Sequence, residues 1–212
     1  QETVPSSGWK IEKVSDRKVR DEWKPLWGKR AVVEDHFNEL VIDLVNPAGQ
    51  PERMQLVVRG YNDGFAFCYK IPDGEGPRVN VQSELTAYNF AGDYTAWFYN
   101  GENHNIGPEK LTETDGTRLP VMTVKAGDKH YMAIHEACLE TGAPLVLQSK
   151  GGESLFSVAS KPTSLSPGYT SAWRVVLYGT TPGVLTDSHL LELLNPDPDS
   201  RYDFSWVKPG LA

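Results

Sequence analysis

The stretch Met54-Gln-Leu-Val-Val-Arg-Gly-Tyr61, followed by Asn62-Asp63-Gly64 and Phe65-Ala-Phe-Cys-Tyr-Lys-Ile71, decides the fold of this chain. Side chains alternate between the two faces of a strand, so each run can line one face with apolar residues. Asn, Asp and Gly are strong turn formers, and Gly64 can adopt the positive φ that a three-residue hairpin loop needs. Few polar residues interrupt either run. We therefore predict a β-hairpin near the middle of a sheet, covered on both faces.

Outside this hairpin, short apolar runs alternate with segments that contain many of the 19 Gly and 15 Pro. Such punctuation is typical of many short strands, and there is no alternation of strands with long helices. Further strands are predicted at residues 9–14, 37–45, 94–99, 119–124, 131–139, 145–148, 155–159 and 173–178, and residues 79–90 are predicted to form one strand or two short ones. The pattern predicts an all-β fold, a large sandwich, in a single domain over residues 1–212.

Three segments have weaker patterns. Residues 16–30 combine charged and aromatic side chains, which predicts an extended surface segment. Residues 100–118 are polar and predict a long loop, and long loops in compact domains are often functional. Residues 185–194 fit either a short helix or a last strand.

Composition argues against several classes of function. The formal net charge is −7 and no Lys/Arg cluster stands out, which argues against a nucleic-acid partner. No apolar run approaches the ~20 residues that span a bilayer. The chain begins with a polar tail at Gln1, so we expect that a signal peptide has been removed or that the chain is an excerpt. Cys68 and Cys138 both lie in apolar strand patterns, which favours two buried thiols over a disulfide.

One carboxylate falls on an apolar strand face. In Tyr131-Met-Ala-Ile-His-Glu-Ala-Cys138, alternation places Glu136 on the same face as apolar side chains. An ionised carboxylate is costly to bury without a partner, and three explanations are open. Glu136 could pair with Arg59 or Arg174, reach solvent at the end of the strand, or bind Ca²⁺. The pattern alone favours the ion pair and ranks the metal last.

Other polar and aromatic residues give weaker signals. His135 falls on the face opposite that carboxylate and is most simply a half-buried histidine. Glu39 and Glu84 are expected at strand rims or in ion pairs. Trp97 and Tyr99 could stack on a sugar ring if they are exposed, although core packing is the simpler role.

Six stretches of the sequence form an ordered set: Trp23-Lys-Pro-Leu-Trp-Gly-Lys-Arg30, Asp35-His-Phe-Asn-Glu-Leu40, Arg59-Gly-Tyr-Asn-Asp-Gly-Phe-Ala-Phe67, Ile134-His-Glu-Ala137, Trp173-Arg-Val-Val176 and Ser205-Trp-Val-Lys-Pro-Gly210. Together they resemble the N-terminal domain of glycoside hydrolase family 97. They occur in the family's order and cover most of the chain from about Trp9 onward.

This resemblance implies a fold and a role. The fold is a large antiparallel β-super-sandwich of the galactose-mutarotase-like type. In the family this domain precedes a C-terminal catalytic (β/α)₈ barrel, and the enzymes are exo-acting α-glycosidases that act on oligosaccharides or other α-glycosides. Some are inverting α-glucosidases and others are retaining α-galactosidases. The resemblance implies a periplasmic or secreted enzyme.

The barrel supplies the catalytic carboxylates, so the resemblance implies no catalytic residue in this chain. The N-terminal domain packs on the barrel, shapes the substrate pocket and contributes one glutamate to a Ca²⁺ site beside the substrate. The motif that holds this glutamate matches Glu136, which moves the metal explanation from last to first. One glutamate cannot hold Ca²⁺, which takes ~6–8 oxygen ligands, so barrel carboxylates are expected to complete the site.

The resemblance also sets expectations about the ends of the chain. The sequence stops at Ala212, about where the barrel should begin, and the opening strands expected before Trp9 are missing. The fragment alone is therefore expected to be inactive. Cys68 and Ala172 stand where the family more often carries Arg and Pro.

Three other functions are open on the residues alone. A stand-alone carbohydrate-binding module would need exposed aromatic side chains. A mutarotase-like epimerase would need a histidine and a glutamate in one cleft, such as Glu136 with His135 or His104. An interaction or structural protein would need no sugar chemistry.

Overall fold

The computed structural model describes residues 7–25, 28–74, 76, 78–81, 83–101, 105–140, 142–159, 163–195, 202–203, 205–208 and 210. Its strands are β1 (Lys10–Trp23), β2 (Val33–Val45), β3 (Arg53–Tyr61), β4 (Gly64–Lys70), β5 (Val79–Val81), β6 (Ala87–Asn89), β7 (Thr95–Tyr99), β8 (Asn105–Lys110), β9 (Asp115–Lys125), β10 (Tyr131–Ala137), β11 (Leu147–Lys150), β12 (Leu155–Val158), β13 (Thr163–Leu165) and β14 (Trp173–Gly179). Its helical segments are η1 (Leu111–Glu113), α1 (Pro182–Asp187) and α2 (Leu190–Leu193).

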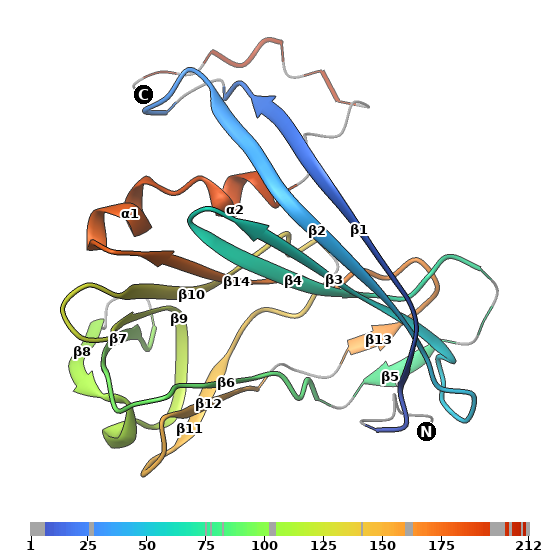
Figure 1. Ribbon diagram of the computed structural model, residues 1–212, viewed down its shortest axis with the longest axis horizontal. Coiled ribbons are helices and arrows are strands. Elements are labelled where there is room, and N and C mark those ends of the chain that lie inside the picture. The colour runs from blue at the N-terminus through green and yellow to red at the C-terminus, as the bar shows by residue number, and fades with distance from the viewer. Residues whose placement is uncertain are drawn as a thin grey trace.

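Within these described residues, twelve strands form one antiparallel sheet (Figure 1). Its order is β1-β2-β3-β4-β14-β10-β9-β11-β12-β6, with β7 beside β9 and β8 beside β7, and β5 pairs with β13 separately. The end of the sheet that carries β11, β12 and β6 folds back under β10 and β14 (Figure 1). The expected all-β super-sandwich is therefore confirmed.

The central hairpin is confirmed as β3 and β4, the third and fourth strands of the sheet. Its turn is shorter than predicted, because Tyr61 already pairs with Gly64 and only two residues connect the strands. Gly64 is needed for a second reason, since a Cβ there would overlap the carbonyl oxygen of Val176 on β14. The expectation of cover on both faces is wrong at Phe65, whose side chain is 43% exposed.

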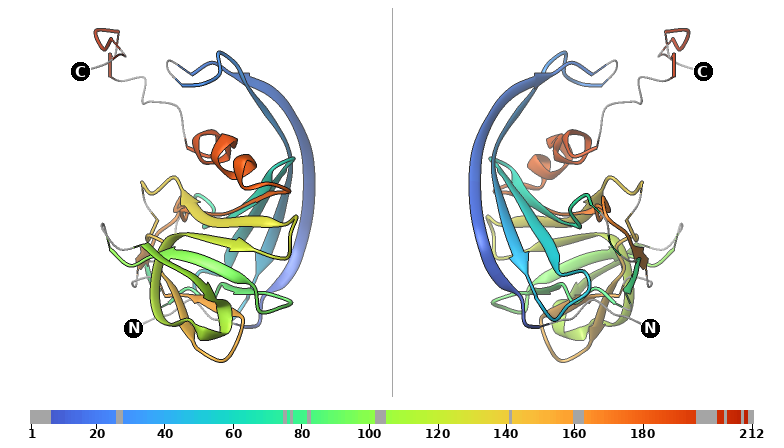
Figure 2. Two further views of the ribbon diagram at one scale, coloured as in Figure 1. Left: turned by 90° about the vertical axis from the view of Figure 1, so that its left-hand side faces the viewer. Right: turned by 90° about the vertical axis from the view of Figure 1, so that its right-hand side faces the viewer.

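The first two strands form a long curved hairpin that extends beyond the rest of the sheet (Figure 2). β1 runs to Trp23, so the charge-rich segment predicted as an extended surface stretch is largely strand. Its side chains are exposed almost throughout, which explains why no apolar alternation marks it. Leu26 and Trp27 lie outside the described residues.

The two faces of the sheet bury separate clusters. Inside the sandwich, side chains of β7, β9, β10, β11, β12 and β14 pack around Phe98, Met122 and Phe156. On the opposite face, Val57, Trp173 and neighbouring side chains pack against Leu190 and Leu194. The helices α1 and α2 lie on the inner side of the β1–β2 arc (Figure 2) and cover this second face. Residues 185–194 are thus helical rather than a last strand.

Two loop predictions need correction. Residues 100–118 contain β8, η1 and the start of β9, because polar residues on an exposed strand such as β8 can still pair through their backbone. The Pro and Gly residues of 161–170 also predict a loop, but this segment contains β13. Cys68 and Cys138 are free thiols, as predicted, but only Cys68 is buried and Cys138 is half-buried. Burial raises the pKa of Cys68 to about 12. No helix among the described residues is long and apolar enough to span a membrane.

Candidate functional site

Glu136 lies near the end of β10 and directly opposite Arg174 on β14. The same row of the sheet continues through Phe67 on β4, Val58 on β3 and Leu40 on β2. Alternation directs all five side chains to one face, the face that forms the inside of the sandwich farther along β10 and β14. The row therefore runs from the charged pair Glu136–Arg174 on β10 and β14 to apolar side chains on β2, β3 and β4.

The Glu136 carboxylate is held through one of its oxygens. Oε2 accepts a hydrogen bond from the backbone N–H of Leu145 and lies 3.6 Å from Nη1 of Arg174. The side chain is 9% exposed, so only a small part of it reaches solvent at the strand end. Burial raises the pKa of Glu136, while the Leu145 N–H and Arg174 oppose this shift. The ion-pair explanation is confirmed, with Arg174 as the partner.

Arg174 makes its shortest contacts with another carboxylate. Its Nε donates to Glu84 Oε1 at 3.0 Å and its Nη2 donates to Glu84 Oε2 at 2.5 Å. Nη2 also donates to the carbonyl of Ala143 at 3.3 Å, and the side chain is only 2% exposed. One buried guanidinium thus contacts both Glu84 and Glu136. We call these three residues the Arg174 cluster, and it has one more acid than base.

Arg59 belongs to a different cluster on the opposite face. Glu39 Oε1 lies 2.6 Å from Arg17 Nε, and Glu39 Oε2 lies 2.7 Å from Arg59 Nε. The Arg59 guanidinium lies between two rings, 4.4 Å from the centroid of Phe37 and 4.9 Å from that of Trp173. Burial raises the pKa of Glu39, but the two arginines outweigh it and the net pKa is lowered. We call this group the Glu39 cluster.

The histidines do not converge on Glu136. His135 points to the opposite face, and its Nδ1 accepts the backbone N–H of Glu136 at 2.8 Å. Burial lowers the pKa of His135. His104 lies outside the described residues. Among the residues that the structure describes, no three His, Cys, Asp or Glu side chains form a metal-binding group. Glu136 is therefore at most a single ligand from this chain.

Trp97 and Tyr99 are exposed rather than packed in the core. Both project from one face of β7, with 36% and 39% of their surfaces accessible. Phe98 between them points inward and is fully buried. The pairing of β7 shifts register on both sides of this region, toward β8 and toward β9. Such bulges change the direction of side chains locally.

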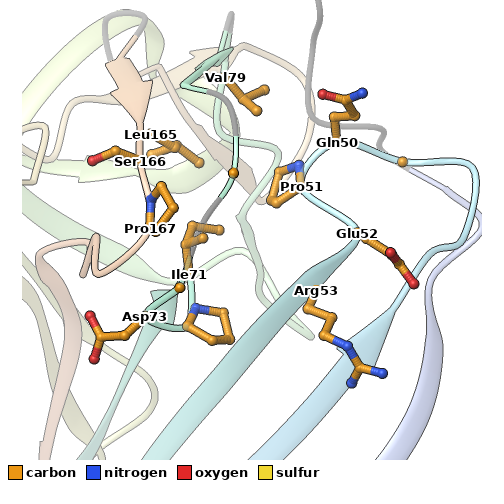
Figure 3. A pocket seen from close by; sticks show the side chains of 14 residues that line it. Gln50, Pro51, Glu52, Arg53, Ile71, Asp73, Val79, Leu165, Ser166 and Pro167 are labelled. Carbon is orange, nitrogen blue, oxygen red and sulfur yellow. The ribbon is translucent and has the colours of Figure 1, made fainter.

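A shallow pocket lies at the other end of the β2–β3 hairpin (Figure 3). It has a volume of about 330 Å³, and Ile71, Val79 and Leu165 form its apolar floor. Glu52 and Asp73 stand at its edge (Figure 3). The pocket shares no residue with the Arg174 cluster and contains no aromatic ring, so it does not extend the candidate site.

Sequence reasoning missed the way Glu84 and Leu145 build the site. Glu84 was expected at a strand rim or in an ion pair, and the ion pair is observed, but nothing in its own segment indicated Arg174 as the partner. The Leu145 N–H comes from a loop whose position depends on the whole sandwich. Only the Glu136–Arg174 pairing can be predicted from the sequence, and this requires the correct register of β10 and β14.

Comparisons with known proteins agree with this architecture. The chain matches the family described as Glycosyl-hydrolase 97 N-terminal over residues 3–196. It is 26% identical over 227 residues to a probable retaining alpha-galactosidase of Streptomyces bingchenggensis, and this match covers 98% of the chain and 32% of the relative.

Solved structures give the same result. A glycoside hydrolase family 97 enzyme from Pseudoalteromonas sp. strain K8, in complex with acarbose, is 25% identical with a TM-score of 0.83. That match covers 97% of this chain and 33% of the enzyme. A beta-arabinopyranosidase shares the fold at 18% identity and a TM-score of 0.70, over 81% of this chain and 32% of its own. The chain spans about a third of these relatives, and it belongs to the glycosyl-hydrolase 97 N-terminal family.

Proposed function

We propose that this chain is the non-catalytic N-terminal domain of an exo-acting α-glycosidase, either an α-glucosidase or an α-galactosidase. The observation that carries this proposal is the family match over residues 3–196, combined with the chain's span of about a third of its relatives. A relative is a probable retaining alpha-galactosidase, and another was solved with acarbose, which is consistent with an α-glycoside as substrate. In this proposal, the two thirds of these relatives that the chain does not match would contain the catalytic (β/α)₈ barrel.

In this proposal the domain packs on the barrel and forms part of the wall of the substrate pocket. The surface of β2–β4 supports such packing, because Leu40 and Phe65 are exposed apolar side chains beside half-buried Val58 and Phe67. These residues lie on the same sheet face as Glu136. A domain that packs on this sheet face would cover the exposed apolar side chains and would also lie close to the Arg174 cluster.

We also propose that Glu136 supplies one ligand to a calcium ion shared with the barrel. The donor chemistry fits, because a carboxylate oxygen is a hard ligand and the surrounding cluster has one more acid than base. The contacts described above engage Oε2, and in this proposal Oε1 would be the ligand atom. The other ligands would come from outside this chain. When bound, calcium would supply positive charge beside the substrate.

The test compares the full-length protein that carries this chain with the purified fragment 1–212. The full-length protein should release nitrophenol from a nitrophenyl α-glucoside or α-galactoside, and a calcium chelator should reduce the rate. The fragment should release none. Hydrolysis by the fragment would contradict the non-catalytic role, and a chelator-insensitive rate would contradict the calcium role. We further propose a periplasmic or secreted location, which fractionation of the native cells would test.

A second function, a carbohydrate-binding module, is favoured by one observation. Trp97 and Tyr99 present exposed rings on the same face of β7, and an aromatic ring can stack on the apolar face of a sugar. Binding of maltooligosaccharides to fragment 1–212, lost on Trp97→Ala, would support this function. Absence of binding at millimolar sugar would exclude it.

A further inference from the structure

We propose that Arg174 and Glu84 are positioning residues that orient the Glu136 carboxylate toward the cation it would bind. This inference rests on the calcium role proposed above and adds two residues to it. Neither Arg174 nor Glu84 would touch the metal. They would act by fixing where the Glu136 oxygens point.

The Arg174 guanidinium is held in place by contacts other than the one with Glu136. Three hydrogen bonds, two to Glu84 and one to the Ala143 carbonyl, fix the plane of the group. A planar guanidinium held in this way has little freedom to rotate. Nη1 of this guanidinium therefore points in a set direction, 3.6 Å from Glu136 Oε2.

Glu84 is itself held by a braced segment between β5 and β6. The nearby Thr86 hydroxyl lies 3.2 Å from the Tyr69 hydroxyl on β4, and the Thr86 carbonyl accepts the Val158 N–H at 2.8 Å. The segment is thus tied to the central sheet and to β12. Glu84 can then hold Arg174 without an ordering cost in each binding event.

The division of contacts suits a positioning role. Glu84 takes the two short hydrogen bonds of the guanidinium, whereas Glu136 has one longer contact through one oxygen. Leu145 donates its N–H to that same oxygen. Arg174 and the Leu145 N–H therefore both orient Glu136, while Glu136 does not form a short bidentate ion pair that would neutralise its charge. Groups that orient a metal ligand in this way typically change metal affinity by 10–100-fold when they are removed.

The test is calcium titration calorimetry on the full-length protein, with unfolding temperatures measured in chelator for each variant. Glu84→Gln and Arg174→Lys should each weaken calcium affinity on the order of 10-fold or more. Arg59→Lys is the matched control, because it weakens a comparable Arg–Glu contact in the Glu39 cluster. It should lower the unfolding temperature without changing calcium affinity. Glu84→Gln is the milder change if Arg174→Lys does not fold.

The outcomes separate this inference from the calcium role itself. If Glu136→Gln loses calcium while Glu84→Gln and Arg174→Lys keep wild-type affinity, the positioning role is wrong and the calcium role stands. If Glu136→Gln keeps wild-type affinity, the calcium role is wrong and the inference falls with it. If Arg59→Lys weakens calcium as much as Arg174→Lys, the effect is one of general stability and the inference is overturned.

Discussion

Two ionic clusters lie one row apart in the same sheet, on opposite faces and with different compositions. In the Glu39 cluster, one carboxylate lies between Arg17 and Arg59 on neighbouring strands. In the Arg174 cluster, one guanidinium lies between two carboxylates. Asp35 also interacts electrostatically with Arg59, so the first group holds as many acids as bases, whereas the second has one more acid than base.

The difference separates a structural cluster from a candidate site. Both oxygens of Glu39 are within 2.7 Å of an arginine nitrogen, so two positive charges already lie against this carboxylate. Within the described part of the chain, the contacts of the Glu136 carboxylate with Leu145 and Arg174 both engage Oε2. The surrounding groups lower the pKa of Glu39 and burial raises that of Glu136, so the charged form is favoured in one cluster and disfavoured in the other. A second positive charge would relieve the excess of acid only around Arg174.

The largest stability effect is expected on removal of the central guanidinium. Arg174→Met would leave Glu84 and Glu136 facing each other without a counter-charge at a site where the arginine is 2% exposed. Loss of one partner from a buried ion pair typically costs about 3–5 kcal/mol. Urea unfolding of fragment 1–212 at pH 7 would measure this. A loss below about 1 kcal/mol, the value typical of exposed pairs, would mean that the cluster is not an integrated buried unit.

A smaller effect is expected from Glu39→Gln, and it should depend on pH. The pKa of Glu39 in the folded protein lies below its ordinary value of 4.5. The unfolded chain therefore binds more protons as the pH falls through 4.5, so the stability from Glu39 is complete above that value. It is lost as the pH falls through the folded-state pKa.

At pH 7, Glu39→Gln should lower the free energy of unfolding by about 2 kcal/mol, the scale of a hydrogen bond to a charged group. Below the folded-state pKa of Glu39 the variant and the wild type should converge. Urea unfolding of fragment 1–212 at several pH values would show this. A difference that stays constant from pH 7 to pH 3 would contradict the assigned protonation behaviour.

The smallest effect is expected at the exposed end of the Glu39 cluster. The Arg17 side chain is 60% exposed, and exposed ion pairs contribute about 0.2–1 kcal/mol. Arg17→Ala should therefore cost less than 1 kcal/mol, and added salt should reduce the difference from wild type. A loss as large as that of Glu39→Gln would show that Arg17, rather than Arg59, is the main partner.

The sequence predicted the fold best where two independent signals agreed. In the β3–β4 hairpin, apolar alternation and turn residues indicate the same structure, and β10 and β14 have equally clear patterns. β1 and β8 were missed in large part because both are exposed strands, and a strand without a buried face has no apolar period to detect.

The candidate site was predicted only in part, for a similar reason. Alternation places Glu136 on an apolar face, but the choice between Arg59 and Arg174 depends on strand register across the sheet. The register puts Arg59 opposite Ala66 and Arg174 opposite Glu136, on different faces. Glu84 and Leu145 were predicted within strands at residues 79–90 and 145–148, but both lie outside the observed strands, so the expected alternation does not give their positions. The family resemblance, not the local pattern, singled out Glu136 for a metal role.

The most direct test of the central claim is calcium affinity in Glu136→Gln and Glu39→Gln versions of the full-length protein, measured side by side by titration calorimetry. Each change replaces a carboxylate whose side chain is less than 10% exposed with an amide of the same shape in one of the two clusters. We predict that Glu136→Gln weakens calcium binding on the order of 100-fold, while Glu39→Gln leaves it unchanged. Equal affinities in the two variants would contradict the assignment of Glu136 as the calcium ligand of this domain.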